Sequence, residues 1–422
     1  MAWWFKIKLW QRVFIALILG VAFGLTVSQA MEPAAAEALL GKVKIIGDVF
    51  IRLIRMIIVP LVFFTLVAGI YAMGDPKKLG TIGVKAFVLY ILTTFFANLL
   101  GLAMGTIIRP GVGVDLGEAA PMTMGEAEPI GQRLMGIIPA NPFQALVEGD
   151  ILAVIFFSLL FGIGLLMARE EGRPAGRFFE SASEGVLKMT YIIMEVAPFG
   201  VFGLIAYVAG TKGVETFTAI FWLTIAVYGG ALIHIFVVYG GLIKIFARLP
   251  VIKFFRGILD AQMVAYSTTS SSATLPVTIT AVSENIGVSK SVAGSVLPLG
   301  ATINMDGTSL YLGIVALFTA QAFGYSLELH HYFLIALTSA LASIGTAGVP
   351  SASLFLLSIV LEVFGVTPEH AALVIGFIFP FDRILDMMRT AVNVTGDAAV
   401  ATTIGRWEGE LDEDVFNAQN TR

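Results

Sequence analysis

The chain has 422 residues, of which 57% are hydrophobic and only 13% are charged, and its mean hydropathy is +0.88. Soluble domains carry about a quarter charged residues, so the composition excludes an ordinary water-soluble protein and indicates one that spans a lipid bilayer. A chain without cysteine holds no disulfide, thiolate zinc site or iron–sulfur cluster, and the net charge of −4 gives no indication of nucleic-acid binding.

Long apolar segments recur along the chain, and about 20 apolar residues are enough for a helix to cross the hydrocarbon core. The first segment follows a basic, aromatic start, and we interpret it as a retained span rather than a cleaved signal peptide. The segment 251–282 is less apolar than its neighbours. We predict spans at 13–30, 45–73, 83–108, 151–167, 191–209, 217–245, 292–322, 333–364 and 371–404.

The distribution of Lys and Arg predicts the orientation of these spans. If the N-terminus is cytoplasmic, most basic residues of the connections fall inside, provided that 251–282 and 329–363 each enter and leave on the same side. The acidic connection 109–150 then becomes a solvated external loop. The tail after Trp407 becomes a frayed cytoplasmic end. We therefore expect a multi-pass protein of the plasma (inner) membrane with both termini in the cytoplasm.

Two segments are too polar for straight spans. Seven of the ten residues in 267–276 carry hydroxyls, and this segment ends at Pro276. The segment 343–353 repeats the pattern, with small and hydroxyl residues before and after Pro350. A close helix contact through small residues is one interpretation. We favour the tips of two helical hairpins that enter the membrane and return, because irregular backbone at membrane depth must be enclosed by protein or face a water-filled cavity.

Each hairpin candidate is followed by a polar sequence that we predict to break a helix, at 304–308 and at 393–397. The second half of the chain is then a hairpin, a broken helix, a second hairpin and a polar helix. Inverted repeats with interrupted helices are typical of secondary transporters, in which the substrate binds near the midplane.

The last predicted helix carries a polar stripe. Exposure of this stripe to lipid would cost about 2.5–3.5 kcal/mol for each charge near the centre, so it must face a polar interior. One explanation is an internal salt-bridge network such as Asp386 with Arg389. The other is a ligand site in which the arginine fork binds a carboxylate, Asp386 accepts from an ammonium group, and further donors bind a second carboxylate, as an acidic amino acid requires. The residues of the stripe, all on one side of the helix, are Asp382, Asp386, Arg389, Thr390, Asn393 and Asp397.

Hard oxygen ligands accompany this stripe. Asn304, Asp306 and Asp397 suit a small alkali cation better than a transition metal. Tyr90, Thr93 and Thr94 form a polar patch on the third span, either as further cation ligands or as hydroxyls that bond back to their own helix. The four histidines show no metal-ligand spacing.

These motifs, together with those at 58–62, 141–143 and 197–202, resemble the dicarboxylate/amino acid:cation symporter family over nearly the whole chain. The resemblance implies an all-α membrane fold with eight transmembrane helices, two re-entrant hairpins and inverted repeats. It also implies a homotrimer. A trimerisation scaffold would comprise about 10–75 and 130–210, and an elevator-like transport part about 80–110 and 215–405, followed by a tail at 406–422.

The resemblance also implies residue roles. Arg389 would bind the substrate side-chain carboxylate and Asp386 its amino group. The remaining substrate contacts would be Asn393, Ser270 and Ser271 at the α-carboxylate, Thr308 and Thr390 along the wall, and Val349 as part of the closing hairpin. Three sodium sites would comprise Asp397, Asn304, Asn393 and Gly300; Thr302 with the carbonyls of Ser343, Ile344 and Thr346; and Tyr90, Thr93, Thr94, Asn304 and Asp306.

The chain departs from the family pattern at several positions. Family members often carry an arginine where this chain has Thr269 or Met387, so we expect a less positive site here. Leu312 occupies a position where Glu or Gln is frequent, which removes the proton carrier of the mammalian type. Ser351 and Ser353 replace frequent glycines of the second hairpin.

We therefore predict a sodium-coupled importer of L-aspartate or L-glutamate that is not an enzyme and needs no organic cofactor. A proton-coupled glutamate symporter of the same fold is the near alternative. An anion channel is a more distant one. An intramembrane protease is disfavoured, because 394–397 matches only part of the Gly-x-Gly-Asp signature and the serine run has no positioned base.

Overall fold

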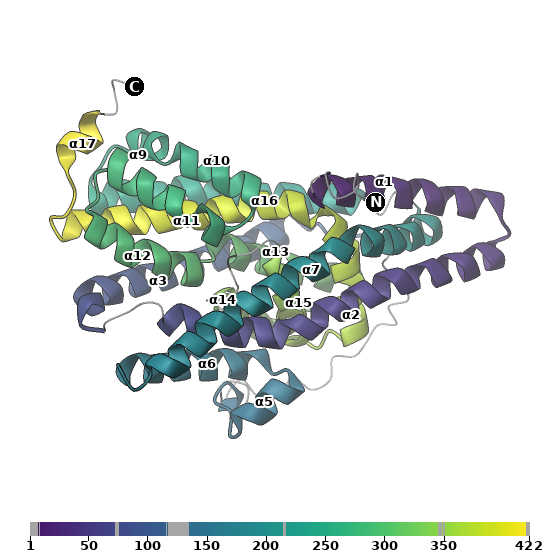
Figure 1. The fold of residues 1–422 in the computed structure, drawn as a ribbon. Coiled ribbons are helices and arrows are strands. Elements are labelled where there is room, and N and C mark those ends of the chain that lie inside the picture. The colour runs from purple at the N-terminus through teal and green to yellow at the C-terminus, as the bar shows by residue number, and fades with distance from the viewer. Residues whose placement is uncertain are drawn as a thin grey trace.

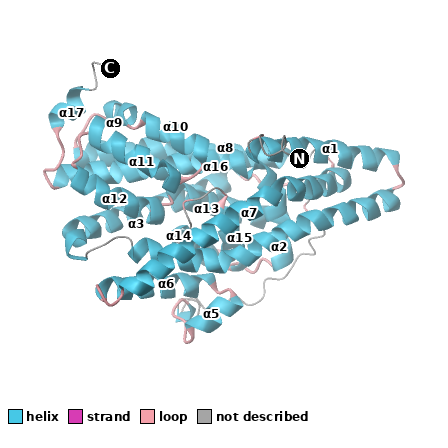
Figure 2. Cartoon of the chain, viewed as in Figure 1, coloured by secondary structure: helices cyan, strands magenta, loops and turns pink. Residues whose placement is uncertain are grey.

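The computed structural model describes residues 9–71, 76–114, 135–213, 217–344 and 351–418, together with residues 7, 116 and 348. These ranges are almost entirely helical (Figure 2). Within them the only β pairing is one isolated bridge between Val288 and Leu411. Six described helices are long and apolar enough to cross a membrane, so the chain is a polytopic membrane protein, as its composition predicts.

Four helices from the first half of the chain, all except α3, form a packed group together with the short α5. α7 runs parallel to α1 and antiparallel to α2, as the contacts between glycines and facing backbone show. A Cβ at Gly24 of α1 would collide with the backbone at Ala206 of α7, and one at Gly203 of α7 would meet the carbonyl of Val43 of α2. The members of this group are α1 (Leu9–Ala30), α2 (Pro33–Tyr71), α6 (Ile151–Met167) and α7 (Arg173–Lys212), with the short α5 (Pro142–Glu148) preceding α6.

The second group contains the polar motifs. α3 packs along α13, and α16 crosses the group beside α10, α12 and α13 (Figure 1). Its members are α3 (Pro76–Ile108), α8 (Thr218–Ile233), η3 (His234–Tyr239), η4 (Leu242–Ala247), α9 (Val251–Gly257), α10 (Leu259–Thr268), α11 (Ser271–Thr280), η5 (Ala281–Asn285), α12 (Lys290–Ile303), α13 (Asp306–Phe323), α14 (Leu329–Ile344), α15 (Ala352–Glu362), α16 (Pro368–Trp407) and α17 (Glu413–Ala418).

The first predicted hairpin segment forms a helix–turn–helix unit, and the second lies between two helices. In the first, Thr269 takes a left-handed conformation with φ of 55° and ends α10, and the Ser270 hydroxyl caps α11 by accepting from Ala273 N at 3.1 Å. In the second, α14 ends at Ile344 and α15 begins at Ala352; residues 345–347 and 349–350 of that turn lie outside the described residues. Their re-entrant placement in a bilayer stays a prediction.

Of the two predicted helix breaks, one is confirmed and one is wrong. α12 ends at Ile303 and α13 begins at Asp306, so the chain is interrupted where the sequence predicts. In contrast, α16 continues without interruption through 393–397. A Cβ at Gly396 would collide with the Tyr239 hydroxyl and the Asn304 amide. This glycine therefore permits close packing and does not end the helix.

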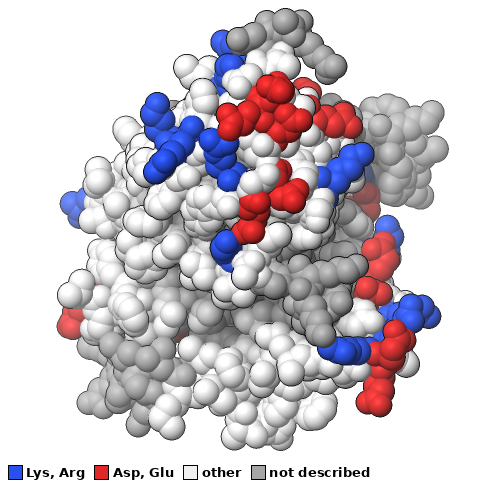
Figure 3. Space-filling model, turned by 90° about the vertical axis from the view of Figure 1, so that its left-hand side faces the viewer, with Lys and Arg blue, Asp and Glu red and all other residues white. Residues whose placement is uncertain are grey.

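At one end of the molecule, the first half of α3 is linked to the end of α16 by an ion pair. Lys85 pairs with Glu408 at 2.5 Å, Arg406 pairs with Glu413, and Lys253 donates to Asn417 at 3.2 Å. Figure 3 shows basic and acidic side chains gathered on this end. Lys85, Lys253 and Arg406, which the orientation argument places on one side, therefore lie at the same end of the molecule, and the assignment of that side to the cytoplasm stays a prediction.

Candidate substrate and cation site

Arg389 of α16 is the centre of a buried charge cluster. Its Nη2 lies 2.8 Å from Asp382 Oδ1 and 2.9 Å from Asp386 Oδ1, and its guanidinium lies over the Tyr311 ring at 4.1 Å from the centroid. Arg389 is 1% exposed and Asp386 is 6% exposed. The polar stripe therefore faces the protein interior, and the salt-bridge network that the sequence suggests is present.

This network leaves part of the arginine fork unused. Nε and Nη1 of Arg389 are buried and have no hydrogen-bond partner among the described residues. A buried donor without a partner loses its hydration with no compensation. Each of these N–H groups can donate to a carboxylate oxygen. The cluster is thus both a salt-bridge network and a site with an open place for an anionic group.

The two hairpins meet next to this cluster. The Ser270 hydroxyl at the tip of the first hairpin donates to Gly348 O of the second at 2.6 Å. Ser351 N of the second hairpin donates to Asp386 Oδ2 at 2.8 Å. Four of the predicted substrate contacts are buried: Ser270, Ser271, Thr308 and Thr390. Val349 lies outside the described residues. The two hairpins are therefore bonded to each other, and the second is also bonded to the arginine cluster.

A second guanidinium reaches the first hairpin tip. Arg383, one turn before the stripe's central residues, donates through Nη1 to Thr269 Oγ1 and through Nη2 to Ser267 O at 2.8 Å. The sequence leads us to expect a less positive site, because Thr269 and Met387 lack the family arginine. Arg383 brings a guanidinium to Thr269 from α16, and the expectation of a less positive site stays a prediction.

The helix break at 304–305 faces the C-terminal half of the stripe. Asn304 Nδ2 donates to Asp397 Oδ1 at 2.9 Å and to Asn393 O at 3.2 Å, while Asn304 Oδ1 is buried without a partner among the described residues. A Cβ at Gly300 would collide with the Asp397 carboxylate and the Tyr90 hydroxyl. Carboxylate, amide and carbonyl oxygens thus converge here, and oxygen ligands of these kinds suit an alkali cation.

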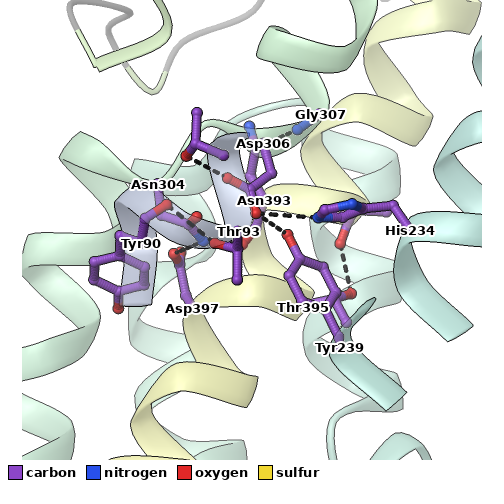
Figure 4. Close-up of polar contacts among 12 residues, drawn as sticks. Tyr90, Thr93, His234, Tyr239, Asn304, Asp306, Gly307, Asn393, Thr395 and Asp397 are labelled. Atoms are coloured by element: carbon purple, nitrogen blue, oxygen red, sulfur yellow. Dashed lines mark hydrogen bonds and ion pairs between the residues drawn. The ribbon is translucent and has the colours of Figure 1, made fainter. Parts of the chain in front are cut away.

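Asp306 is the centre of a second oxygen cluster (Figure 4). Thr94 Oγ1 donates to Asp306 Oδ1 at 2.6 Å, as the cation interpretation requires. Thr93 bonds back to Tyr90 O at 3.1 Å, as the alternative interpretation of the patch expects, and the Tyr90 hydroxyl donates to Val296 O at 3.0 Å. The predicted patch is therefore divided between the two interpretations.

Two partners of Asp306 come from residues that the sequence analysis does not single out for this site. Tyr239 OH donates to Asp306 Oδ2 at 2.7 Å, and His234 Nε2 lies 3.2 Å from the same oxygen. Both side chains are completely buried. Within the described part of the chain, no three His, Asp or Glu side chains form a group that could hold a metal ion.

The predicted sodium site around Thr302 is supported by fewer contacts than the other two. The Thr302 hydroxyl donates to Pro298 O at 3.0 Å, and the Ser343 hydroxyl donates to Ala340 O at 2.8 Å. The resemblance assigns the carbonyls of Ser343 and Ile344 as ligands, and Thr346 lies outside the described residues. This set stays a prediction.

Comparisons with known proteins find one matching family and several relatives. A family model described as the sodium:dicarboxylate symporter family matches residues 9–407. A protein named proton/sodium-glutamate symport protein from Geobacillus stearothermophilus is 36% identical over 418 residues, which cover 97% of this chain and 96% of that protein. One of the same name from Bacillus subtilis (strain 168) is 36% identical, with coverages of 96% and 94%. A C4-dicarboxylate transport protein from Bordetella avium (strain 197N) is 34% identical, with coverages of 97% and 91%.

Proposed function

Because this chain belongs to the sodium:dicarboxylate symporter family, we propose that it is a sodium-coupled symporter that imports L-aspartate or L-glutamate. The substrate assignment rests on the guanidinium of Arg389 beside Asp386, of which only one nitrogen has a hydrogen-bond partner among the described residues. Nε and Nη1 have no partner among the described residues, whereas Nη2 is held by Asp382 and Asp386. A transporter with this site is not an enzyme and needs no organic cofactor.

The charges favour an amino acid over a plain dicarboxylate. Asp382, Asp386 and Arg389 together carry one net negative charge when all three are ionised. A dicarboxylate would add two further negative charges beside Asp386. An acidic amino acid brings an ammonium group for Asp386 together with a carboxylate for the Arg389 fork. Relatives are named for glutamate and for C4-dicarboxylates, so this difference is the feature to test.

Sodium is the proposed coupling ion. The oxygen-rich sets around Asp397 and Asp306 support it, as does the unpaired Asn304 Oδ1. When bound, sodium would supply positive charge at these oxygens and hold the helix break against α16. Proton coupling on the same fold remains the second candidate, because relatives are named as proton/sodium symporters.

The proposed mechanism uses the hairpin tips as gates. Ser270 and Ser351 close the site through bonds to Gly348 O and Asp386, and substrate release requires one of these contacts to open. As in the family pattern, we propose a homotrimer in which the transport part moves past a fixed scaffold, with both termini in the cytoplasm of the inner membrane.

The test is uptake of labelled aspartate, glutamate and succinate into proteoliposomes, under an inward sodium gradient alone and an inward proton gradient alone. We expect accumulation of the two amino acids with sodium only, and its loss in Arg389→Ala. Accumulation driven by protons without sodium would replace the proposed ion by the second candidate. Acidic amino acid uptake that survives Arg389→Ala unchanged would refute the substrate assignment, and flow that never exceeds equilibrium would indicate a channel.

A further inference from the structure

Asp306 is held by an unusual pair of neighbours. The carboxylate is completely buried, and its Oδ2 contacts both Tyr239 OH, at 2.7 Å, and His234 Nε2, at 3.2 Å. A ring nitrogen that faces a carboxylate oxygen makes an attractive contact when it carries the proton, so both groups act as donors. The two rings also pack edge to face, with centroids 4.6 Å apart.

The local helix geometry explains how one segment supplies both donors. In an α-helix with 3.6 residues per turn, positions five apart point about 140° away from each other. His234 and Tyr239 are the first and last residues of η3, which is a π-helix. The i→i+5 hydrogen bonds of a π-helix bring positions five apart onto the same face. An α-helical turn here would direct one of the two side chains away from Asp306.

The two donors leave the other carboxylate oxygen in a distinct environment. Oδ1 accepts only from the Thr94 hydroxyl among the described residues, at 2.6 Å. A threonine hydroxyl can turn its hydrogen away and present its own oxygen. Oδ1 and Thr94 Oγ1 would then form two adjacent cation ligands, while Oδ2 stays fixed.

We propose that the π-helical turn His234–Tyr239 positions Asp306 as a ligand of the coupling cation, and that His234 and Tyr239 thereby determine its selectivity. This inference rests on the proposed sodium coupling. The two side chains act through Asp306 and are positioning residues, not ligands. A carboxylate held by two donors keeps a fixed distance to its cation. Without them it moves toward a smaller ion, so the preference for sodium over lithium falls.

The test is cation binding to the purified full-length protein without any transport step. The half-saturating concentrations of NaCl and LiCl are measured from the rise in thermal unfolding temperature, with choline chloride maintaining ionic strength. Tyr239→Phe removes one hydroxyl with little change of shape, and His234→Leu removes the second donor. His234→Gln supplies a side-chain N–H in place of the imidazole N–H. Tyr228→Phe is the matched control: its hydroxyl donates to Ile384 O at 2.8 Å from the preceding helix α8.

We expect Tyr239→Phe and His234→Leu each to raise the half-saturating sodium concentration about tenfold, the loss of one bond to a charged group. We also expect the sodium-to-lithium ratio to shift toward lithium, His234→Gln to restore most of the preference, and Tyr228→Phe to leave the ratio unchanged. Unchanged ratios in Tyr239→Phe and His234→Leu would overturn the inference while sodium coupling stands. If the wild-type protein binds aspartate but does not respond to sodium, sodium coupling fails, and the inference fails with it.

Discussion

Replacing Arg389 by lysine separates the charge of this residue from its fork. Lysine keeps a positive charge beside Asp382 and Asp386, and so avoids most of the about 3–5 kcal/mol that breaking a buried ion pair costs. What it loses are the two separate donors Nε and Nη1, which have no partner among the described residues. Any loss of binding then reports on recognition of the substrate carboxylate rather than on unfolding.

The magnitude follows from the two lost donors. A hydrogen bond to a charged group contributes about 1.5–3 kcal/mol, and the lysine ammonium can replace one of the two. The remaining loss of about 1.5–3 kcal/mol corresponds to a roughly 10- to 150-fold weaker affinity, since each 1.4 kcal/mol is about tenfold. The same substitution at Arg406, which pairs with Glu413 and is about one-third exposed, should leave the affinity unchanged.

The assay is equilibrium binding of labelled L-aspartate at saturating sodium, with the thermal unfolding temperature measured in parallel. We expect weaker binding in Arg389→Lys at nearly unchanged stability, and wild-type binding in Arg406→Lys. Wild-type affinity in Arg389→Lys would show that the free guanidinium nitrogens do not bind the substrate, and the reasoning from their unpaired state would be refuted.

Three further substitutions test the other parts of the site. Asp386→Asn should weaken binding of aspartate more than that of succinate in competition assays, because only the amino acid has an ammonium group; equal losses would contradict this role. Arg383→Ala should change the initial uptake rate because it releases the hairpin tip. Adding Thr269→Arg should restore the wild-type rate by returning a guanidinium to the tip. An initial rate that stays at the wild-type value in Arg383→Ala would argue against a role for the Arg383–Thr269 contact. Asp397→Asn should raise the half-saturating sodium concentration for uptake about tenfold or more, and an unaltered sodium dependence would remove Asp397 from the cation site.

Much of the fold could be predicted from composition and local pattern. Apolar length predicts most of the long helices, and the hydroxyl-rich run before Pro276 predicts a helix–turn–helix where α10 and α11 meet. The same reasoning fails at 393–397. A polar sequence with glycine indicates a helix break only where the backbone groups face solvent or a bound ion. In α16 the Thr395 hydroxyl bonds back to Ala391 O at 2.6 Å, and Gly396 packs against Tyr239. Tertiary packing thus accounts for the glycine.

The part of the site that lies on a single helix could be predicted from the sequence. Spacing alone places the polar stripe on one side of α16, and the structure buries that side around Arg389. Spacing could not reveal His234 and Tyr239 as partners of one carboxylate, because α-helical periodicity separates positions five apart. Nor could it predict Arg383, which lies off the stripe and reaches Thr269 on a segment more than a hundred residues away. Both failures arise from long-range contacts and a local change of helix type.

The arrangement of Asn393 suggests how a cation and a substrate affect each other. Its side-chain oxygen accepts from Gly307 N at 2.8 Å, and its backbone oxygen accepts from Asn304 Nδ2, which also donates to Asp397. A Cβ at Gly307 would collide with the backbone of Arg389, so the helix break packs directly on α16 at this residue. A cation bound at Asp397 would hold the break, and the break would hold Asn393 and Arg389. Because such coupling is reciprocal, the proposed function requires sodium to raise the affinity for aspartate by the same factor by which aspartate raises the affinity for sodium.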